Sequence, residues 1–256
     1  MAISYIKLSR IYISLFAALT TVTGFFLNPH HTSTAVISAL AVFLLACGAS
    51  SLNQYQERDL DAKMERTRRR PLPSGLITPA RVLCFSLIVI CSGELILLRS
   101  GENLPCLLGI IAVLLYNGIY TPLKKITAFA FIPGAAVGMI PPAIGWVTAG
   151  GTLYDPRLIA ICFILFMWQI PHFLLLVLRY AREFHEAGIP SLAEVLSSAS
   201  IVRVIFIWIF ASSVTSLLLP LYNAVQTLIV YFTLFPLAAW LLWKGGWQEY
   251  CSGQGR

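Results

Sequence analysis

Charged residues are scarce in this chain, since Asp, Glu, Lys and Arg together make up only 11% of its 256 residues. Soluble domains carry about 25% charged residues and about 45–50% apolar ones. Here 58% of the residues are hydrophobic and the mean hydropathy is +0.79. The shortage of charge excludes an ordinary soluble domain and indicates an integral membrane protein that crosses the bilayer several times.

The chain also lacks paired cysteines. Its six Cys residues are scattered, five of them lie within apolar runs, and none forms a CxxC pair. This spacing argues against a zinc site or a disulfide framework and favours small core residues. The first apolar run is too long for a cleavable signal peptide and has no small-residue cleavage site, so we expect it to stay as a membrane span.

Eight apolar runs approach the roughly 20 residues that a membrane helix needs. They cover residues 9–28, 33–52, 79–98, 103–120, 126–149, 157–178, 201–219 and 221–243. With a cytoplasmic N-terminus, 16 of the 18 Lys and Arg residues fall on the cytoplasmic side, and only Arg99 and Arg157 do not. We therefore expect one all-α domain over residues 1–256, a polytopic membrane bundle of about eight transmembrane helices with both termini in the cytoplasm.

Three charged segments share the cytoplasmic side of this arrangement, namely 53–78, 121–126 and 179–200. An active site could be assembled from all three. The formal net charge of +7 needs no nucleic acid to explain it, because a basic excess on this side can face anionic lipid and an anionic substrate.

The segment from Asn53 to Gly75 holds four of the 11 carboxylates and six of the 18 basic residues. Asn53, Glu57 and Asp61 are four residues apart, so on a helix they form one stripe. Carboxylates at this spacing repel each other by a few tenths of a kcal/mol, and a cation between them removes that penalty. Oxygen ligands of this kind suit Mg²⁺ that is completed by water and substrate phosphates.

Basic residues follow the stripe directly, at Lys63, Arg66 and Arg70, and can hold phosphate oxygens. Lys124 and Lys125 in the next charged segment can do the same. Carboxylates alone would repel a diphosphate, whereas carboxylates with a metal and Arg would bind it. The alternative is a solvated loop whose basic residues only set the membrane topology.

The sixth run contains a histidine, His172, one residue after Pro171. A polar residue at membrane depth usually faces a cavity or a partner, although a lone histidine is more often a hydrogen-bonded structural group. A second acidic group follows at Glu183 and Glu186, which are helical neighbours. Gly and Pro are dense between Gly134 and Gly145, where they allow close helix packing or a broken backbone ladder beside a cavity.

Four strings in this chain resemble the UbiA-type intramembrane prenyltransferases, and within them the protohaem IX farnesyltransferase (haem O synthase) family. The stripe N-x-x-x-E-x-x-x-D resembles the first aspartate-rich motif of the superfamily. The strings are ERDLDAKMERTRRRPLPSG at 57–75, YTPLKKIT at 120–127, PGAAVGMIPPAIGW at 133–146, and WQIPHF with AGIPSL at 168–173 and 187–192. The similarity covers about half of the chain, from residue 50 to 192.

This resemblance implies a helical bundle around a central cavity in the inner membrane of a bacterium. The donor would be farnesyl diphosphate, the cofactor Mg²⁺ and the acceptor haem B, whose vinyl group would gain a hydroxyethylfarnesyl tail. Asn53, Glu57 and Asp61 would hold the metal, with Lys63, Arg66, Arg70 and Lys124 as counter-charges for the leaving diphosphate. Tyr116, Tyr120 and Trp168 could stabilise an allylic cation, and His172 could contact the haem. Glu183 and Glu186 are candidates for a second metal–diphosphate site.

Two other functions stay open at this point. One is a UbiA-type prenyltransferase with an aromatic acceptor such as a hydroxybenzoate or a naphthoate. The other is a protein without this catalysis, either a transporter or an inactive haem-handling paralogue. Protein partners are unknown from the sequence.

Overall fold

The computed structural model describes residues 2–28, 35–99 and 103–217. Every regular element in these residues is a helix, which confirms the all-α class. Six helical segments are long and apolar enough to cross a membrane: α3 (Ala35–Gln56), α5 (Pro79–Leu98), Asn103–Leu123, Ala128–Thr148, α10 (Pro156–Ala187) and α11 (Ser198–Leu217). The shorter α2 (Ile11–Leu27) is also apolar. The expected span 221–243 lies outside the described residues.

Two of these segments are interrupted rather than regular. Asn103–Leu123 consists of α6 (Asn103–Val113), the π-helix η1 (Leu114–Tyr120) and α7 (Thr121–Leu123). Ala128–Thr148 consists of η2 (Ala128–Ala130), α8 (Phe131–Val137) and α9 (Ile140–Thr148). Pro141 and Pro142 lack the N–H groups that would continue the α-helical ladder, so the break before them has a covalent cause.

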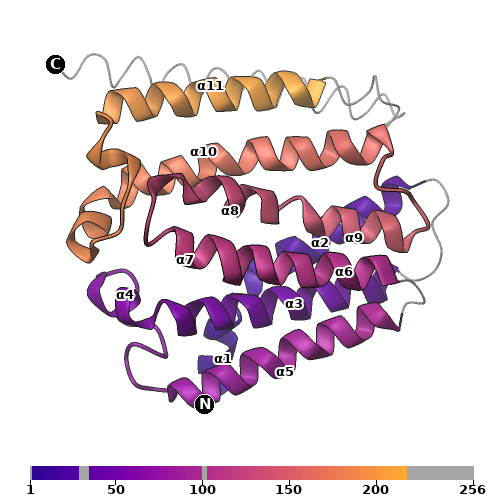
Figure 1. Cartoon of the computed structure of the whole chain (residues 1–256), viewed down its shortest axis with the longest axis horizontal. Coiled ribbons are helices and arrows are strands. Elements are labelled where there is room, and N and C mark those ends of the chain that lie inside the picture. The colour runs from indigo at the N-terminus through magenta and orange to yellow at the C-terminus, as the bar shows by residue number, and fades with distance from the viewer. Residues whose placement is uncertain (1, 29–34, 100–102, 218–256) are drawn as a thin grey trace.

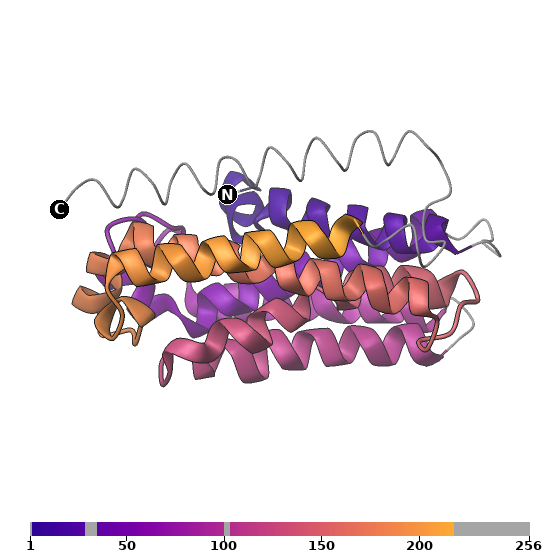
Figure 2. The same cartoon turned by 90° about the horizontal axis from the view of Figure 1, so that it is seen from above.

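The helices pack side by side, with α3 along α5 and α2, α2 against α9, and α10 along α11 (Figures 1 and 2). Small residues allow the closest approach, since a Cβ on Gly145 would collide with the backbone oxygen of Thr21. One core cluster joins α3, α5 and α9 through Val42, Leu45, Ile90 and Ile144 among others. Gly145 in α9 therefore serves helix packing, one of the two roles expected for the Gly- and Pro-rich segment.

Large apolar side chains remain exposed around the outside of the bundle. Val36, Ile88 and Ile207 are 77%, 60% and 62% exposed. In water such a surface would be costly, whereas lipid tails solvate it. The chain is thus an integral membrane protein, as its composition predicts.

The charged segments gather at one end of the bundle, on the left in Figure 1, where α4 (Arg58–Lys63), α7 and the connection from α10 to α11 lie. These charged segments are partly helical. The helix α3 continues to Gln56, and α10 continues to Ala187 before Gly188 ends it at φ 72°. The connections also pack together, because Met64 meets Ala187 and Ile189 in a buried cluster.

Candidate active site

The acidic stripe crosses a break between two helices. Glu57 has φ −104° and ψ 5°, and separates α3 from α4. Backbone bonds nevertheless keep the helical spacing, since the Glu57 N–H donates to the Asn53 carbonyl at 3.0 Å and the Asp61 N–H to the Glu57 carbonyl at 2.7 Å. Asn53, Glu57 and Asp61 are 1%, 3% and 1% exposed. The stripe is therefore buried along its whole length.

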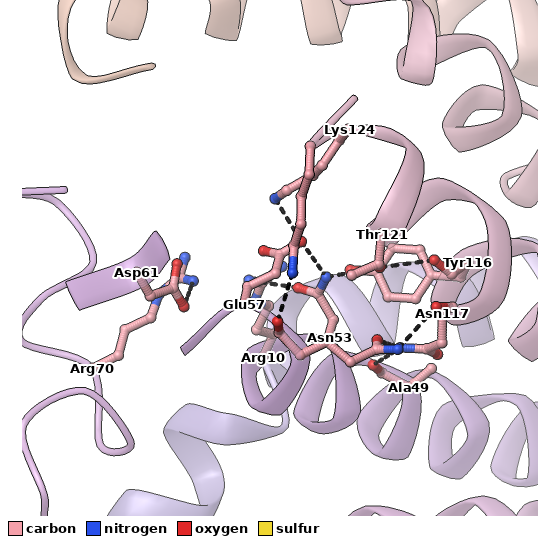
Figure 3. Close-up of polar contacts among 12 residues, drawn as sticks. Arg10, Ala49, Asn53, Glu57, Asp61, Arg70, Tyr116, Asn117, Thr121 and Lys124 are labelled. Atoms are coloured by element: carbon pink, nitrogen blue, oxygen red, sulfur yellow. Dashed lines mark hydrogen bonds and ion pairs between the residues drawn. The ribbon is translucent and has the colours of Figure 1, made fainter. Parts of the chain in front are cut away.

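Asn53 and Glu57 form the centre of a polar cluster (Figure 3). The Asn53 side-chain amide donates to Glu57 Oε1 at 2.7 Å and to Thr121 Oγ1 at 3.0 Å. Lys124 Nζ lies 2.6 Å from the same Glu57 oxygen, and Arg10 donates to Asn53 Oδ1 at 3.4 Å. Residues from three distant parts of the chain thus converge on one carboxylate and one amide.

Asp61 lies to one side of that cluster with its own cation (Figure 3). Arg70 donates to Asp61 Oδ2 at 2.7 Å, and Thr67 Oγ1 donates to the Asp61 backbone carbonyl at 2.8 Å. The other carboxylate oxygen, Oδ1, is buried and has no hydrogen-bond partner within the described part of the chain. A buried acceptor without a donor is costly unless a ligand completes it.

The cations at this site are crowded. Burial and, next, the positive charge of Arg10 lower the pKa of the Arg70 guanidinium. Arg10, Arg70 and Lys124 face only two carboxylates, Glu57 and Asp61. The site therefore carries an excess of positive charge that an anionic group can relieve.

A divalent cation fits the donor set of the stripe. The described residues contain no group of three or more His, Cys, Asp or Glu side chains that could hold a metal by themselves. Two carboxylates and one amide, with Asp61 Oδ1 unpaired, instead offer an incomplete set of oxygen ligands. Mg²⁺ binds in this way, with few protein ligands and with water or phosphate oxygens in the other positions.

Two of the expected counter-charges, Lys63 and Arg66, make no ion pair with the stripe within the described residues. Lys63 is exposed on α4. The Arg66 guanidinium lies over the Tyr180 ring at 4.8 Å from its centroid, and the Arg66 backbone N–H donates to Glu183 Oε2 at 3.3 Å. The structure thus places Arg70 and Lys124 at the stripe, and Arg66 at the end of α10.

The second acidic group is engaged with surface partners. Glu186 accepts from Arg182 at 2.7 Å, where the Arg182 side chain is 92% exposed. His185 lies 3.4 Å from Glu194, on the short helix η3 (Leu192–Glu194). Glu183 and Glu186 are thus held by different groups, Glu183 by the Arg66 backbone N–H and Glu186 by Arg182.

Aromatic rings form a row that begins beside the polar cluster. Tyr116 and Tyr120 are stacked, with centroids 5.6 Å apart and planes at 17°. Trp168 and His172 are also parallel, at 5.8 Å and 7°, and both side chains are exposed. Consecutive contacts at 5.6 to 6.1 Å join Tyr116, Tyr120, Phe173, His172, Trp168 and Phe16. The row links η1 to α10 and α2.

Arg10 is the site residue that sequence reasoning missed, because it counted only toward membrane topology. It is the one described non-glycine residue with positive φ, at 43°, in the turn between α1 (Ala2–Leu8) and α2. A left-handed conformation is unfavourable for arginine, so contacts must hold it. Its place directly before an apolar run was the available signal.

Comparison with known proteins gives one consistent family. The UbiA prenyltransferase family matches residues 17–250. A protohaem IX farnesyltransferase of Geobacter sulfurreducens is 40% identical over 84% of this chain and 80% of the relative. The protein of that name from Nitratidesulfovibrio vulgaris is 38% identical over 86% of this chain and 77% of the relative.

Solved structures agree in fold. A UbiA homologue from Aeropyrum pernix, solved without ligand, has a TM-score of 0.79 at 16% identity and covers 92% of this chain and 88% of its own. A UbiA homologue from Archaeoglobus fulgidus, bound to DMAPP and Mg²⁺, has a TM-score of 0.75 at 14% identity over 97% of this chain and 86% of its own.

Proposed function

This chain belongs to the UbiA prenyltransferase family, and from that membership we propose that it transfers a farnesyl group from farnesyl diphosphate to a vinyl group of haem B. It is a membrane prenyltransferase, and its curated relatives are named protohaem IX farnesyltransferase. In this reaction the C–O bond of the donor breaks and diphosphate leaves with its electron pair. The farnesyl carbon bonds to the terminal vinyl carbon, and water supplies the hydroxyl group at the other.

The buried stripe is the observation that carries this proposal. Three carboxylate or amide side chains in an apolar protein, all at most 3% exposed, would be expensive without a ligand to bind. Asn53, Glu57 and Asp61 would hold Mg²⁺, which when bound would neutralise the diphosphate as a Lewis acid.

The basic residues then have a second partner available. With Glu57 and Asp61 bound to a metal, their present partners Lys124 and Arg70 would be available to bind phosphate oxygens. Arg10 adds a third cation on the same side. Charge-assisted hydrogen bonds of this kind stabilise a leaving diphosphate more than its ground state, which lowers the barrier to ionisation.

The aromatic row supplies the apolar part of the site. The faces of Tyr116 and Tyr120 lie beside the polar cluster, where an allylic cation would form, and each such face can contribute roughly 0.5–2 kcal/mol. The rings of Trp168 and His172 are parallel and exposed, and a planar tetrapyrrole could stack against them. An imidazole in this position could also contact the haem iron.

Orientation in the membrane follows from the same site. We assign the end with α4 and α7 to the cytoplasm, in the inner membrane of a bacterium, because it carries the clustered Lys and Arg residues. Farnesyl diphosphate is charged and cannot cross the bilayer core unaided, so its binding site belongs on the side where it is made.

Mass spectrometry of haems from cells that express this chain tests the proposal. The expected result is a haem that carries the hydroxyethylfarnesyl group, formed by purified protein only with farnesyl diphosphate, haem B and Mg²⁺. Prenylation of a hydroxybenzoate or a naphthoate instead would assign a different acceptor. Absence of diphosphate release with every acceptor would point to a transporter or an inactive paralogue.

A further inference from the structure

The π-helix η1 leaves one backbone carbonyl without its helical donor. The Thr121 N–H donates to the Tyr116 carbonyl, five residues back, rather than to Asn117. The next residue, Pro122, has no N–H to offer. The Asn117 carbonyl, in a residue that is 4% exposed, therefore needs a donor from outside its own helix.

Gln56, the last residue of α3, supplies that donor. Its side-chain amide donates to the Asn117 backbone carbonyl at 3.0 Å. In return the Asn117 side-chain amide donates to Gln56 Oε1 at 3.0 Å and to the Ala49 carbonyl at 3.1 Å. Four groups of two residues 61 positions apart are thus paired, and we call this contact the amide clamp.

The clamp sits at the point from which the candidate phosphate-binding residues extend. Thr121 follows η1 directly and accepts from Asn53, and Lys124 comes one turn later and pairs with Glu57. Lys125 closes the arrangement, because its Nζ donates to the Gln56 carbonyl at 3.0 Å. The register of η1 against α3 therefore determines where Lys124 reaches.

We propose that Gln56 and Asn117 are positioning residues, which hold the π-helical register so that Lys124 reaches the metal–diphosphate site. The inference rests on the function proposed above. Neither residue carries charge or contacts the reacting atoms, so each acts through Lys124. A π-helix is rare and strained, and persists where outside contacts over-determine it.

A double-mutant cycle with Lys124 tests the proposal. Asn117→Ala alone is expected to lower kcat/KM for farnesyl diphosphate by roughly tenfold to hundredfold, the cost of displacing one catalytic group by about 1 Å. In the Lys124→Ala background the same change should have little further effect, because the group that it positions is already gone. Gln56→Ala, at a less buried residue, is the second variant in case Asn117→Ala fails to fold.

The matched control removes a different hydrogen bond that a side-chain amide makes between helices. Asn28 donates to the Trp146 carbonyl at 3.2 Å, at the end of α2 that is remote from Arg10. Any loss caused by Asn28→Ala should be the same with and without Lys124. If Asn117→Ala and Gln56→Ala also lower kcat/KM by the same factor with and without Lys124, the positioning role is overturned.

Hydrogen exchange separates this inference from the proposed function. The amides of 114–124 should exchange faster in Asn117→Ala and Gln56→Ala than in the wild type, whatever reaction the protein performs. If the wild type does not transfer farnesyl, the proposed function fails while exchange still reports on the clamp. Unchanged exchange in both variants would refute the clamp even in an active enzyme.

Discussion

Two acidic groups lie at the same end of this bundle, and their surroundings differ sharply. In the first, Asn53, Glu57 and Asp61 are all at most 3% exposed, and their partners come from distant segments. In the second, the Glu186 side chain is 55% exposed and pairs with Arg182, four positions along the chain, and Glu183 accepts from a backbone N–H.

The difference shows which carboxylates lower the stability of the fold by being buried. A carboxylate at the surface is hydrated and its ion pair contributes little, whereas a buried one loses hydration and needs a designed set of partners. The first group has such partners but still leaves one Asp61 oxygen unpaired. The second group needs no ligand to complete it. Sequence spacing alone makes the two groups look similar, and burial separates them.

Among substitutions in the two acidic groups, Asp61→Ala should reduce farnesyl transfer the most. It removes the one stripe carboxylate with an unpaired buried oxygen and leaves Arg70 without its partner. We expect farnesyl transfer to fall by roughly a hundredfold to a thousandfold, the scale for losing a group that stabilises developing charge. Diphosphate release by purified protein at saturating Mg²⁺ measures it.

The control for Asp61→Ala is the amount of folded protein recovered in detergent, compared with Glu194→Ala, which removes a partly exposed carboxylate at the same end of the bundle. Loss of transfer with normal recovery supports a role in the reaction. Wild-type turnover in Asp61→Ala would remove the residue from the mechanism.

Arg10→Gln should have the second-largest effect on farnesyl transfer. The substitution keeps a hydrogen-bond donor near Asn53 Oδ1 but removes the positive charge. We expect kcat/KM for farnesyl diphosphate to fall by roughly tenfold to hundredfold, with much of the change in KM, because the phosphate contact proposed for Arg10 would be lost. Arg182→Gln, which breaks an exposed pair in the second group, is the matched control. Equal effects of the two substitutions would mean that Arg10 only sets topology.

His172→Ala should weaken binding of the haem acceptor and leave binding of farnesyl diphosphate unchanged. Its ring lies parallel to Trp168 on an exposed surface, away from the stripe. We expect roughly tenfold weaker haem binding, equivalent to about 1.4 kcal/mol, with an unchanged KM for farnesyl diphosphate. Titration of haem absorbance against purified protein measures it, and His185→Ala is the control histidine. Unchanged haem affinity and product yield would support a structural role for His172.

The sequence was sufficient for the parts of this comparison that depend on local spacing. Apolar runs predicted the helices, since length and hydropathy decide membrane insertion, and the interval of four predicted that Asn53 and Glu57 share a face. It could not reveal Arg10 or the pairing of Gln56 with Asn117. Those contacts join residues 43 and 61 positions apart and depend on how the helices pack.

The same limit applies to helix register. In a π-helix each backbone hydrogen bond spans five residues instead of four, and nothing in the letters LLYNGIY distinguishes it from an α-helix. Pro122 can be read from the sequence. That the Asn117 carbonyl takes its donor from Gln56 cannot, because it depends on how α3 packs against η1.

Glu186→Gln should have the smallest effect and so sharpens the contrast between the two groups. Its carboxylate pairs with an Arg182 side chain in open surroundings, and solvent screens such a pair. We expect kcat/KM to change by less than about threefold, measured in the same diphosphate-release assay as Asp61→Ala. A loss close to that of Asp61→Ala would show instead that substrate binding draws the second group inward to share the metal or the diphosphate. Burial of a carboxylate would then be a poor guide to whether it takes part in the reaction.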